Sequence, residues 1–193
     1  MIRHDSISQT LIIIGVMITL YLATYQLTSV ILFPVVLLFS GVMLQLYIER
    51  KIEYVNHMTE PSTLKNVAFY TIIAFFGIAL TGYVVANLPF ELTGFDALLF
   101  AILMAIAEEP FFRGFITNYL LLKLKNPSIA IILSGFIFGV YHLARYGGDH
   151  SALIYVSLGG MILSWAAYRS GRLSPCMLAH IINNIIATMG GIV

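Results

Sequence analysis

The sequence predicts an all-α fold, a polytopic transmembrane helical bundle of about seven spans. Hydrophobic residues make up 60% of the 193 residues and charged residues only 10%, whereas soluble domains carry about 25% charged residues. The apolar residues are grouped in runs of roughly 17–25, the length that a helix needs to cross the hydrocarbon core. The net charge of +1 and the lack of a basic stripe argue against nucleic-acid binding.

The apolar runs define the expected spans and the polar breaks define the turns between them. A short break at 26–29 makes the first two spans a tight hairpin, and the long polar segment 49–65 is expected to be a solvated loop or surface helix. A break at 87–94 ends the third span, and the turn at 123–127 joins the fourth to the fifth. We expect one membrane domain over 1–193, with the spans at 8–26, 28–48, 66–87, 95–122, 127–145, 152–169 and 173–191.

The distribution of Lys and Arg predicts the orientation of the bundle. With a cytoplasmic N-terminus, eight of the ten basic residues fall on the cytoplasmic side, only Arg145 falls outside, and Arg113 lies within a span. Cytoplasmic loops of membrane proteins carry an excess of Lys and Arg. We therefore expect an integral protein of a prokaryotic plasma membrane with its N-terminus in the cytoplasm and its C-terminus outside.

The fourth apolar run contains three ionisable residues within six positions, Glu108, Glu109 and Arg113. Charged groups inside a membrane are costly and usually have a partner or a function. Glu109 and Arg113 are four residues apart, which predicts an ion pair on one helix face. Glu108 is rotated by about 100° from Glu109, so it should face a different helix. Pro110 cannot donate a backbone hydrogen bond, which frees the carbonyl of Ile106 and predicts a bend.

Polar residues in two further spans are candidates for the same site. Glu108 and His142 are equally distant from the turn at 123–127, so an antiparallel hairpin places them at the same depth. His180 and Asn184 are four apart and share one helix face, and they could alternatively serve only as contacts between helices. His180 is about nine residues from its own turn and Glu108 about sixteen, a depth difference of roughly 10 Å unless the fourth and fifth helices extend beyond the bilayer.

Asn183 is expected to point away from this face and to bond a neighbouring helix. Cys176, the single cysteine, excludes an internal disulfide and is expected to pack in the core.

These motifs, in this order and on separate apolar segments, resemble those of the CPBP family of intramembrane proteases. The family is named for CAAX proteases and bacteriocin-processing proteins, and is also called the type II CAAX prenyl endopeptidase or Abi family. The resemblance covers 95–190, the expected catalytic core. The motifs are Glu108-Glu109-x-x-x-Arg113, Phe138-x-x-x-His142 and His180-x-x-x-Asn184.

The resemblance implies an intramembrane endopeptidase that hydrolyses a peptide bond of a membrane-anchored protein or peptide. By the pattern of the family, Glu108 with His142 would activate the attacking water, and His180 with Asn184 would stabilise the oxyanion. Substrates could include prenylated proteins with a CAAX terminus or peptide precursors. The residues that would support the site are Glu109, Arg113 and Phe138.

The sequence leaves two mechanisms open. Glu108, His142 and His180 could bind zinc with water as the fourth ligand, which would make the protein a metalloprotease. Against this, the sequence has no His-Glu-x-x-His motif, and no carboxylate that would orient either histidine is evident. We therefore favour a metal-independent glutamate mechanism without a cofactor.

Two other functions compete with the protease. One is a non-catalytic immunity or scaffold protein of the same fold, for which Glu108 would have no physical purpose. The other is a small transporter or channel with a buried Glu/His proton relay. That function predicts an internal repeat or matching broken helices, and the sequence shows neither.

Overall fold

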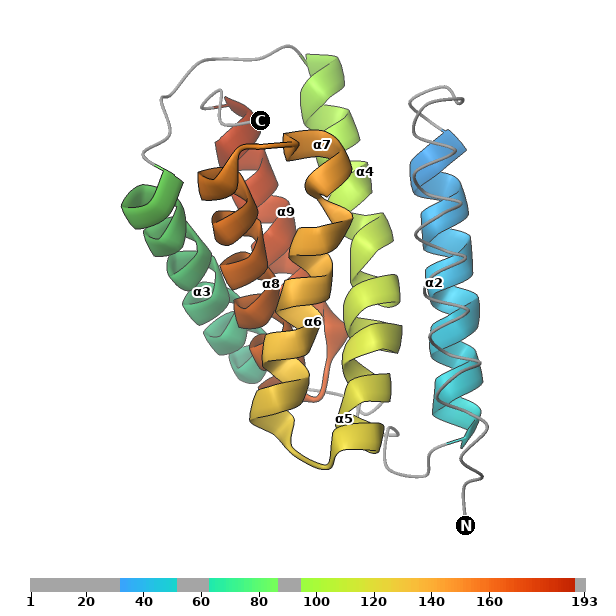
Figure 1. The fold of residues 1–193 in the computed structure, drawn as a ribbon. Helices are drawn as coiled ribbons and strands as arrows, with labels where there is room; N and C mark the ends of the chain where they lie inside the picture. The colour runs from blue at the N-terminus through green and yellow to red at the C-terminus, as the bar shows by residue number, and fades with distance from the viewer. Residues whose placement is uncertain (1–31, 52–62, 87–94, 190–193) are drawn as a thin grey trace.

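The computed structural model describes residues 32–51, 63–86 and 95–189, and all its regular elements are helices. The described helices run alternately up and down in one bundle (Figure 1). The elements are α2 (Leu32–Lys51), α3 (Leu64–Thr81), the π-helix η2 (Gly82–Ala86), α4 (Phe95–Glu109), the π-helix η3 (Pro110–Thr117), α5 (Asn118–Leu124), α6 (Pro127–Tyr141), α7 (Leu143–Tyr146), α8 (His150–Ser170) and α9 (Leu173–Met189).

The described helices agree with the expected spans in position. Three of them are long and apolar enough to cross a membrane, Leu64–Val85, Pro127–Tyr146 and His150–Ser170, and two shorter helices, Phe33–Ile48 and Leu173–Ala187, are also apolar. The structure thus supports a membrane protein with three candidate spans and not the full set of seven. The expected span 8–26, most of the polar segment 49–65 and the break 87–94 lie outside the described residues.

The outer surface of the bundle is apolar. Large side chains such as Phe39, Phe76 and Phe136 expose more than half of their surface. In water such exposure would be unfavourable. In a bilayer, apolar side chains contact the lipid tails, and the helix satisfies its own backbone polar groups. The outer surface is therefore suited to contact with lipid.

The turn between α5 and α6 follows from its local sequence. Lys125 adopts a left-handed conformation with φ of 52°, which ends α5. The Asn126 side chain accepts hydrogen bonds from the backbone N–H groups of Ser128 and Ile129 at 3.1 and 3.2 Å, and Pro127 occupies the first position of α6. An asparagine cap followed by proline is a strong helix start. The predicted hairpin at 123–127 is confirmed.

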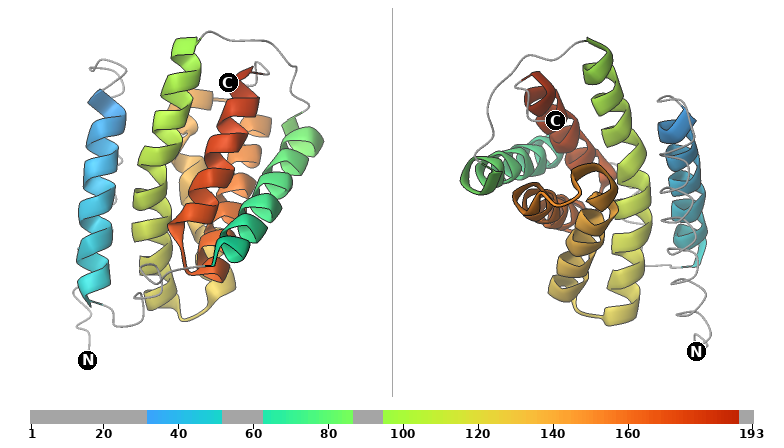
Figure 2. Two further views of the ribbon diagram at one scale, coloured as in Figure 1. Left: turned by 180° about the vertical axis from the view of Figure 1, so that it is seen from behind. Right: turned by 45° about the horizontal axis from the view of Figure 1, so that its top comes forward.

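Glycines allow α6 and α8 to cross closely. A Cβ atom on Gly135 would lie 2.6 Å from the backbone nitrogen of Met161, and one on Gly160 would lie 3.1 Å from the Cα of Gly135. Any side chain at Gly135 would therefore push the helices apart. In Figure 2, α9 lies between α4 and α3, and α2 lies on the outer side of α4. This arrangement surrounds the polar segment of α4 and η3 with helices.

Candidate active site

The polar motif of the fourth span lies where an α-helix changes into a π-helix. α4 ends at Glu109 and η3 begins at Pro110. Proline has no N–H to continue the α-helical ladder to the carbonyl of Ile106. Further along η3, the side-chain hydroxyl of Thr117 donates to the carbonyl of Phe112 at 2.9 Å. Single π-helical turns inside α-helices occur frequently at functional sites. The predicted bend at Pro110 is thus realised as a wider helical turn.

Glu109 connects two basic side chains in the interior. Its Oε1 atom accepts from Nη1 of Arg113 at 3.0 Å, so the predicted ion pair is confirmed. The same oxygen lies 2.7 Å from Nδ1 of His180. The expectation that no carboxylate orients a histidine is therefore wrong for His180. Glu109 and His180 are 71 positions apart, and the sequence gave no sign of this contact because it depends on how α9 packs against α4.

Arg113 is fully buried and has contacts on several sides, although its Nε atom has no hydrogen-bond partner among the described residues. Its Nη2 atom donates to the carbonyl of Gly160 at 3.3 Å. Its guanidinium also lies over the ring of Phe138, 4.4 Å from the centroid, a favourable cation–π geometry. Phe138 thus covers the guanidinium of Arg113 from α6.

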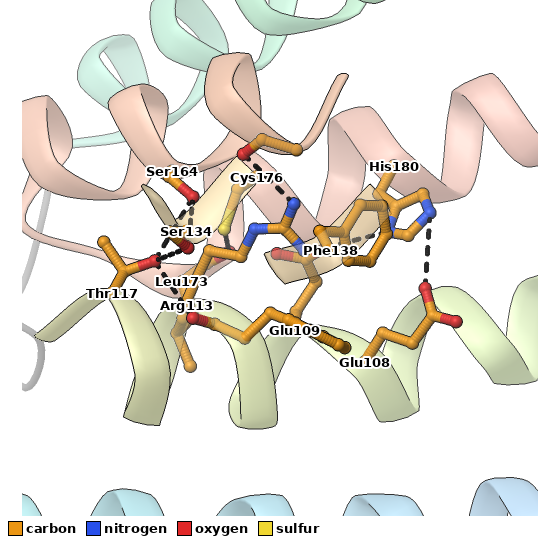
Figure 3. A network of polar contacts seen from close by, with 12 residues as sticks. Glu108, Glu109, Arg113, Thr117, Ser134, Phe138, Ser164, Leu173, Cys176 and His180 are labelled. Carbon is orange, nitrogen blue, oxygen red and sulfur yellow. Dashed lines mark hydrogen bonds and ion pairs between the residues drawn. The ribbon is translucent and has the colours of Figure 1, made fainter. Parts of the chain in front are cut away.

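Glu108 faces a different part of the interior from Glu109, as the helical spacing predicts. It is only 3% exposed, and its Oε2 atom lies 3.8 Å from Nε2 of His180 (Figure 3). The anticipated depth difference between Glu108 and His180 is absent. The helical stretch from α4 through η3 to α5 continues to Leu124, and this length brings the two residues to one level.

All four proposed catalytic side chains line a single cavity. The cavity has a volume of about 70 Å³, and Glu108, His142, His180 and Asn184 all contribute to its wall. A water molecule needs about 10–15 Å³ of such volume, so the cavity has room for several. A buried carboxylate, two imidazoles and an amide around water-sized space provide a base, proton donors and acceptors for hydrolysis.

Two of these side chains already make one hydrogen bond each to the backbone. His142 lies at the C-terminal cap of α6, and its Nδ1 atom is 2.8 Å from the carbonyl of Phe138. This contact fixes the ring, so that Nε2 is the second ring nitrogen available for chemistry. Asn184 donates from Nδ2 to the carbonyl of Ala101 on α4 at 3.0 Å. The neighbouring Asn183 accepts a hydrogen bond from Tyr155 on α8, as predicted. It also lines the cavity, so the expectation that it points away from the site is wrong.

The arrangement does not fit a three-ligand metal site. Among residues 32–51, 63–86 and 95–189, no three His, Cys, Asp or Glu side chains are placed to hold one metal ion. Nδ1 of His180 bonds Glu109 and Nδ1 of His142 bonds a carbonyl, which are contacts that also orient histidines in metal sites.

A second buried polar cluster was not predicted. Thr117, Ser134 and Ser164, hereafter the hydroxyl cluster, come from η3, α6 and α8. The Thr117 hydroxyl lies 2.7 Å from that of Ser134 and 3.2 Å from that of Ser164, and the two serines are 3.0 Å apart. Single serines and threonines are common in membrane helices, so nothing in the sequence set these three apart. Only the crossing of the helices brings them together.

Comparison with known proteins identifies the family. The family model described as type II CAAX prenyl endopeptidase Rce1-like matches residues 90–186, half of the chain. The chain belongs to this family. Membership confirms the resemblance found in the sequence and supports peptidase activity in general terms, since the family is one of proteases.

Among curated proteins, the chain is similar to the uncharacterized protein YyaK of Bacillus subtilis (strain 168). The two are 29% identical over 97 residues, which are 48% of this chain and 32% of YyaK. The match thus spans about a third of the length of that relative. No solved structure matches the chain.

Proposed function

We propose that this protein is an intramembrane endopeptidase in which Glu108 activates water for attack on a peptide bond of a membrane-anchored protein or peptide. The observation that carries the proposal is the shared cavity. Glu108 from α4, His142 from the end of α6, and His180 and Asn184 from α9 all line it. A scaffold or immunity protein would have no need to bury these groups around a space for water.

In the proposed reaction, Glu108 accepts a proton from a water molecule as its oxygen attacks the peptide carbonyl. His142 accepts or donates a second hydrogen bond that orients this water. The tetrahedral intermediate carries a negative charge on the former carbonyl oxygen. The proton held by Glu108 then passes to the leaving nitrogen, and the C–N bond breaks to give a carboxylic acid and an amine, between which the remaining proton then redistributes to give a carboxylate and an ammonium group.

His180 and Asn184 are placed to stabilise the oxyanion. Nδ1 of His180 lies 2.7 Å from Oε1 of Glu109, and this contact holds the ring with Nε2 on the side of Glu108 and the cavity. In the proposed reaction Nε2 donates to the oxyanion. Asn184 uses one N–H to bond Ala101, and its second amide hydrogen remains to complete a two-donor pocket.

The test is proteolysis of a quenched-fluorescence library of membrane peptides by the purified protein in detergent. Glu108→Gln keeps the shape of the side chain and removes the base, and we expect a loss of about 100–10,000-fold in rate. His142→Ala should also lose activity. Asp149→Asn is the matched control, because it makes the same carboxylate-to-amide change at an exposed helix cap that asparagine also fills well.

Each assay would be run with and without a strong chelator. Activity that chelator leaves intact and that Glu108→Gln abolishes supports the glutamate mechanism. Loss with chelator and recovery with zinc would replace it by a metalloprotease mechanism. Folded wild-type protein that cleaves no peptide in the library would instead support the scaffold function.

A further inference from the structure

One part of the cavity wall has no role in the proposed reaction. Asn183 on α9 and Tyr155 on α8 both line the cavity, and both side chains are half-buried. Asn183 follows His180 by three positions, a spacing that places two side chains on the same side of a helix. These two polar residues therefore border the same space as Glu108.

A hydrogen bond from Tyr155 determines which end of the Asn183 amide is occupied. The Tyr155 hydroxyl donates to Oδ1 of Asn183 at 3.1 Å. A side-chain amide has one oxygen that accepts and one NH2 group that donates two hydrogen bonds. Within the described part of the chain, no residue accepts a hydrogen bond from Nδ2 of Asn183. The NH2 group is thus the part of this side chain that another molecule can bind.

The ring of Tyr155 is held by close packing. A Cβ atom on Gly82 would lie only 3.1 Å from Cε2 of Tyr155, so the glycine leaves room for the ring. The ring also packs against two clusters of buried apolar side chains, one that includes Phe138 and one that includes Ile78. A fixed ring gives the hydroxyl a fixed position, and the hydroxyl in turn holds the amide of Asn183 in one orientation.

The two neighbouring asparagines of α9 therefore have different anchors. Asn184 is anchored on α4, where its Nδ2 atom donates to the carbonyl of Ala101 at 3.0 Å. Asn183 is anchored on α8 through its oxygen and keeps both amide hydrogens. A peptide backbone carries one carbonyl per residue. When one carbonyl occupies the oxyanion position, a carbonyl of an adjacent residue remains to accept from the second amide.

We propose that Asn183 binds a backbone carbonyl of the substrate next to the scissile peptide bond, and that Tyr155 is the positioning residue that orients its amide. The inference rests on the proposed peptidase function and adds a binding subsite to it. Because every peptide has such a carbonyl, the subsite holds the substrate backbone whatever its side chains are.

The chemistry of this contact predicts its kinetic signature. The adjacent carbonyl does not change its charge during hydrolysis, so Asn183 binds it equally well in the ground state and in the transition state. An interaction of this kind lowers KM without raising kcat. Loss of the contact should therefore raise KM and leave kcat nearly unchanged, whereas loss of an oxyanion donor lowers kcat.

The first part of the test compares variants in steady-state kinetics. Asn183→Ala should raise KM about 3–10-fold, the effect of one neutral hydrogen bond. Tyr155→Phe keeps the ring and should raise KM by a smaller factor. The double variant should resemble Asn183→Ala alone, because Tyr155 acts through the amide. Asn66→Ala is the matched control, since it removes an exposed amide from the first turn of α3, and its KM should equal that of the wild type.

The second part removes the carbonyl from the substrate. In two peptide analogues, a trans-alkene replaces the peptide bond on one or the other side of the scissile bond, which keeps the extended shape. With the wild type, one analogue should have a KM raised by a factor similar to that of Asn183→Ala. With Asn183→Ala, the same analogue should raise KM much less, because the donor is already absent.

The outcomes distinguish this inference from the proposed function. If the wild type cleaves the peptides but both analogues act independently of Asn183→Ala, the subsite is overturned and the peptidase stands. A lower unfolding temperature in detergent with unchanged KM would assign Asn183 to helix packing alone, and a fall in kcat at constant KM would also overturn the subsite. Folded wild-type protein that cleaves no peptide contradicts the peptidase, and the subsite with it.

Discussion

Two polar clusters lie in the apolar interior of this bundle, and they differ in what their hydrogen bonds achieve. In the hydroxyl cluster, three short side chains bond one another and the backbone. In the cavity cluster, His142, His180 and Asn184 each bond a partner outside the cluster. Together with Glu108 they border a water-sized space.

The difference shows which buried polar groups indicate function. When buried polar side chains bond only one another and the backbone, they stabilise helix packing, because every donor finds an acceptor within the protein. A polar side chain that lines a cavity can still form a hydrogen bond with another molecule that enters the cavity. Glu108 and Glu109 illustrate this with one residue type, since Glu109 is enclosed by Arg113 and His180 while Glu108 borders the cavity.

The largest effect on stability should come from replacing Glu109, the glutamate enclosed by Arg113 and His180. Glu109→Gln leaves the buried Arg113 without an anionic partner, and breaking such a pair costs about 3–5 kcal/mol. We expect a much lower unfolding temperature in detergent and a poor yield. Glu108→Gln is the matched control and should unfold at nearly the wild-type temperature. Equal destabilisation by the two changes would contradict the distinction between the two glutamates.

The next effect concerns the neighbouring asparagines of α9. Asn184→Ala removes a proposed oxyanion donor, and we expect kcat to fall by about 100–1,000-fold. Asn183→Ala removes an acceptor of Tyr155 and should change kcat far less. Steady-state kinetics of the two purified variants checks this, and a larger loss for Asn183→Ala would transfer the oxyanion role to that residue.

The smallest effect is expected in the hydroxyl cluster. Thr117→Val keeps the shape and removes the hydroxyl that Ser134 and Ser164 both contact, which should lower the free energy of unfolding by about 1–3 kcal/mol. The kcat of the folded variant should be unchanged. Chemical unfolding in detergent with a parallel activity assay measures both quantities. A strong loss of activity in folded Thr117→Val would mean that the two clusters are coupled.

Much of the fold could be predicted from local signals in the sequence. The helix boundaries near the turn at 123–127 followed from Asn126 and Pro127, which act within a few residues. The ion pair of Glu109 and Arg113 followed from helical spacing. The grouping of Glu108 with His142 around one space followed from their equal distance to the turn.

The remaining features depend on contacts between distant segments. The bond from Glu109 to His180 requires the exact packing of α9 on α4, and the hydroxyl cluster requires the close crossing of α6 and α8 at Gly135 and Gly160. Pro110 predicted a disturbed helix, but nothing local in the sequence predicted that the helix continues as a π-helix over Pro110–Thr117. None of these features can be predicted from the spacing of residues along one helix.

The packed layer beneath the cavity has a consequence for permeability. Phe138 and Leu163 line the cavity and are almost fully buried, as are Arg113 and the hydroxyl cluster. A fixed guanidinium repels hydronium and other cations. If the proposed function holds, the described residues would keep water for hydrolysis in the cavity while Arg113 opposes the passage of cations through the interior.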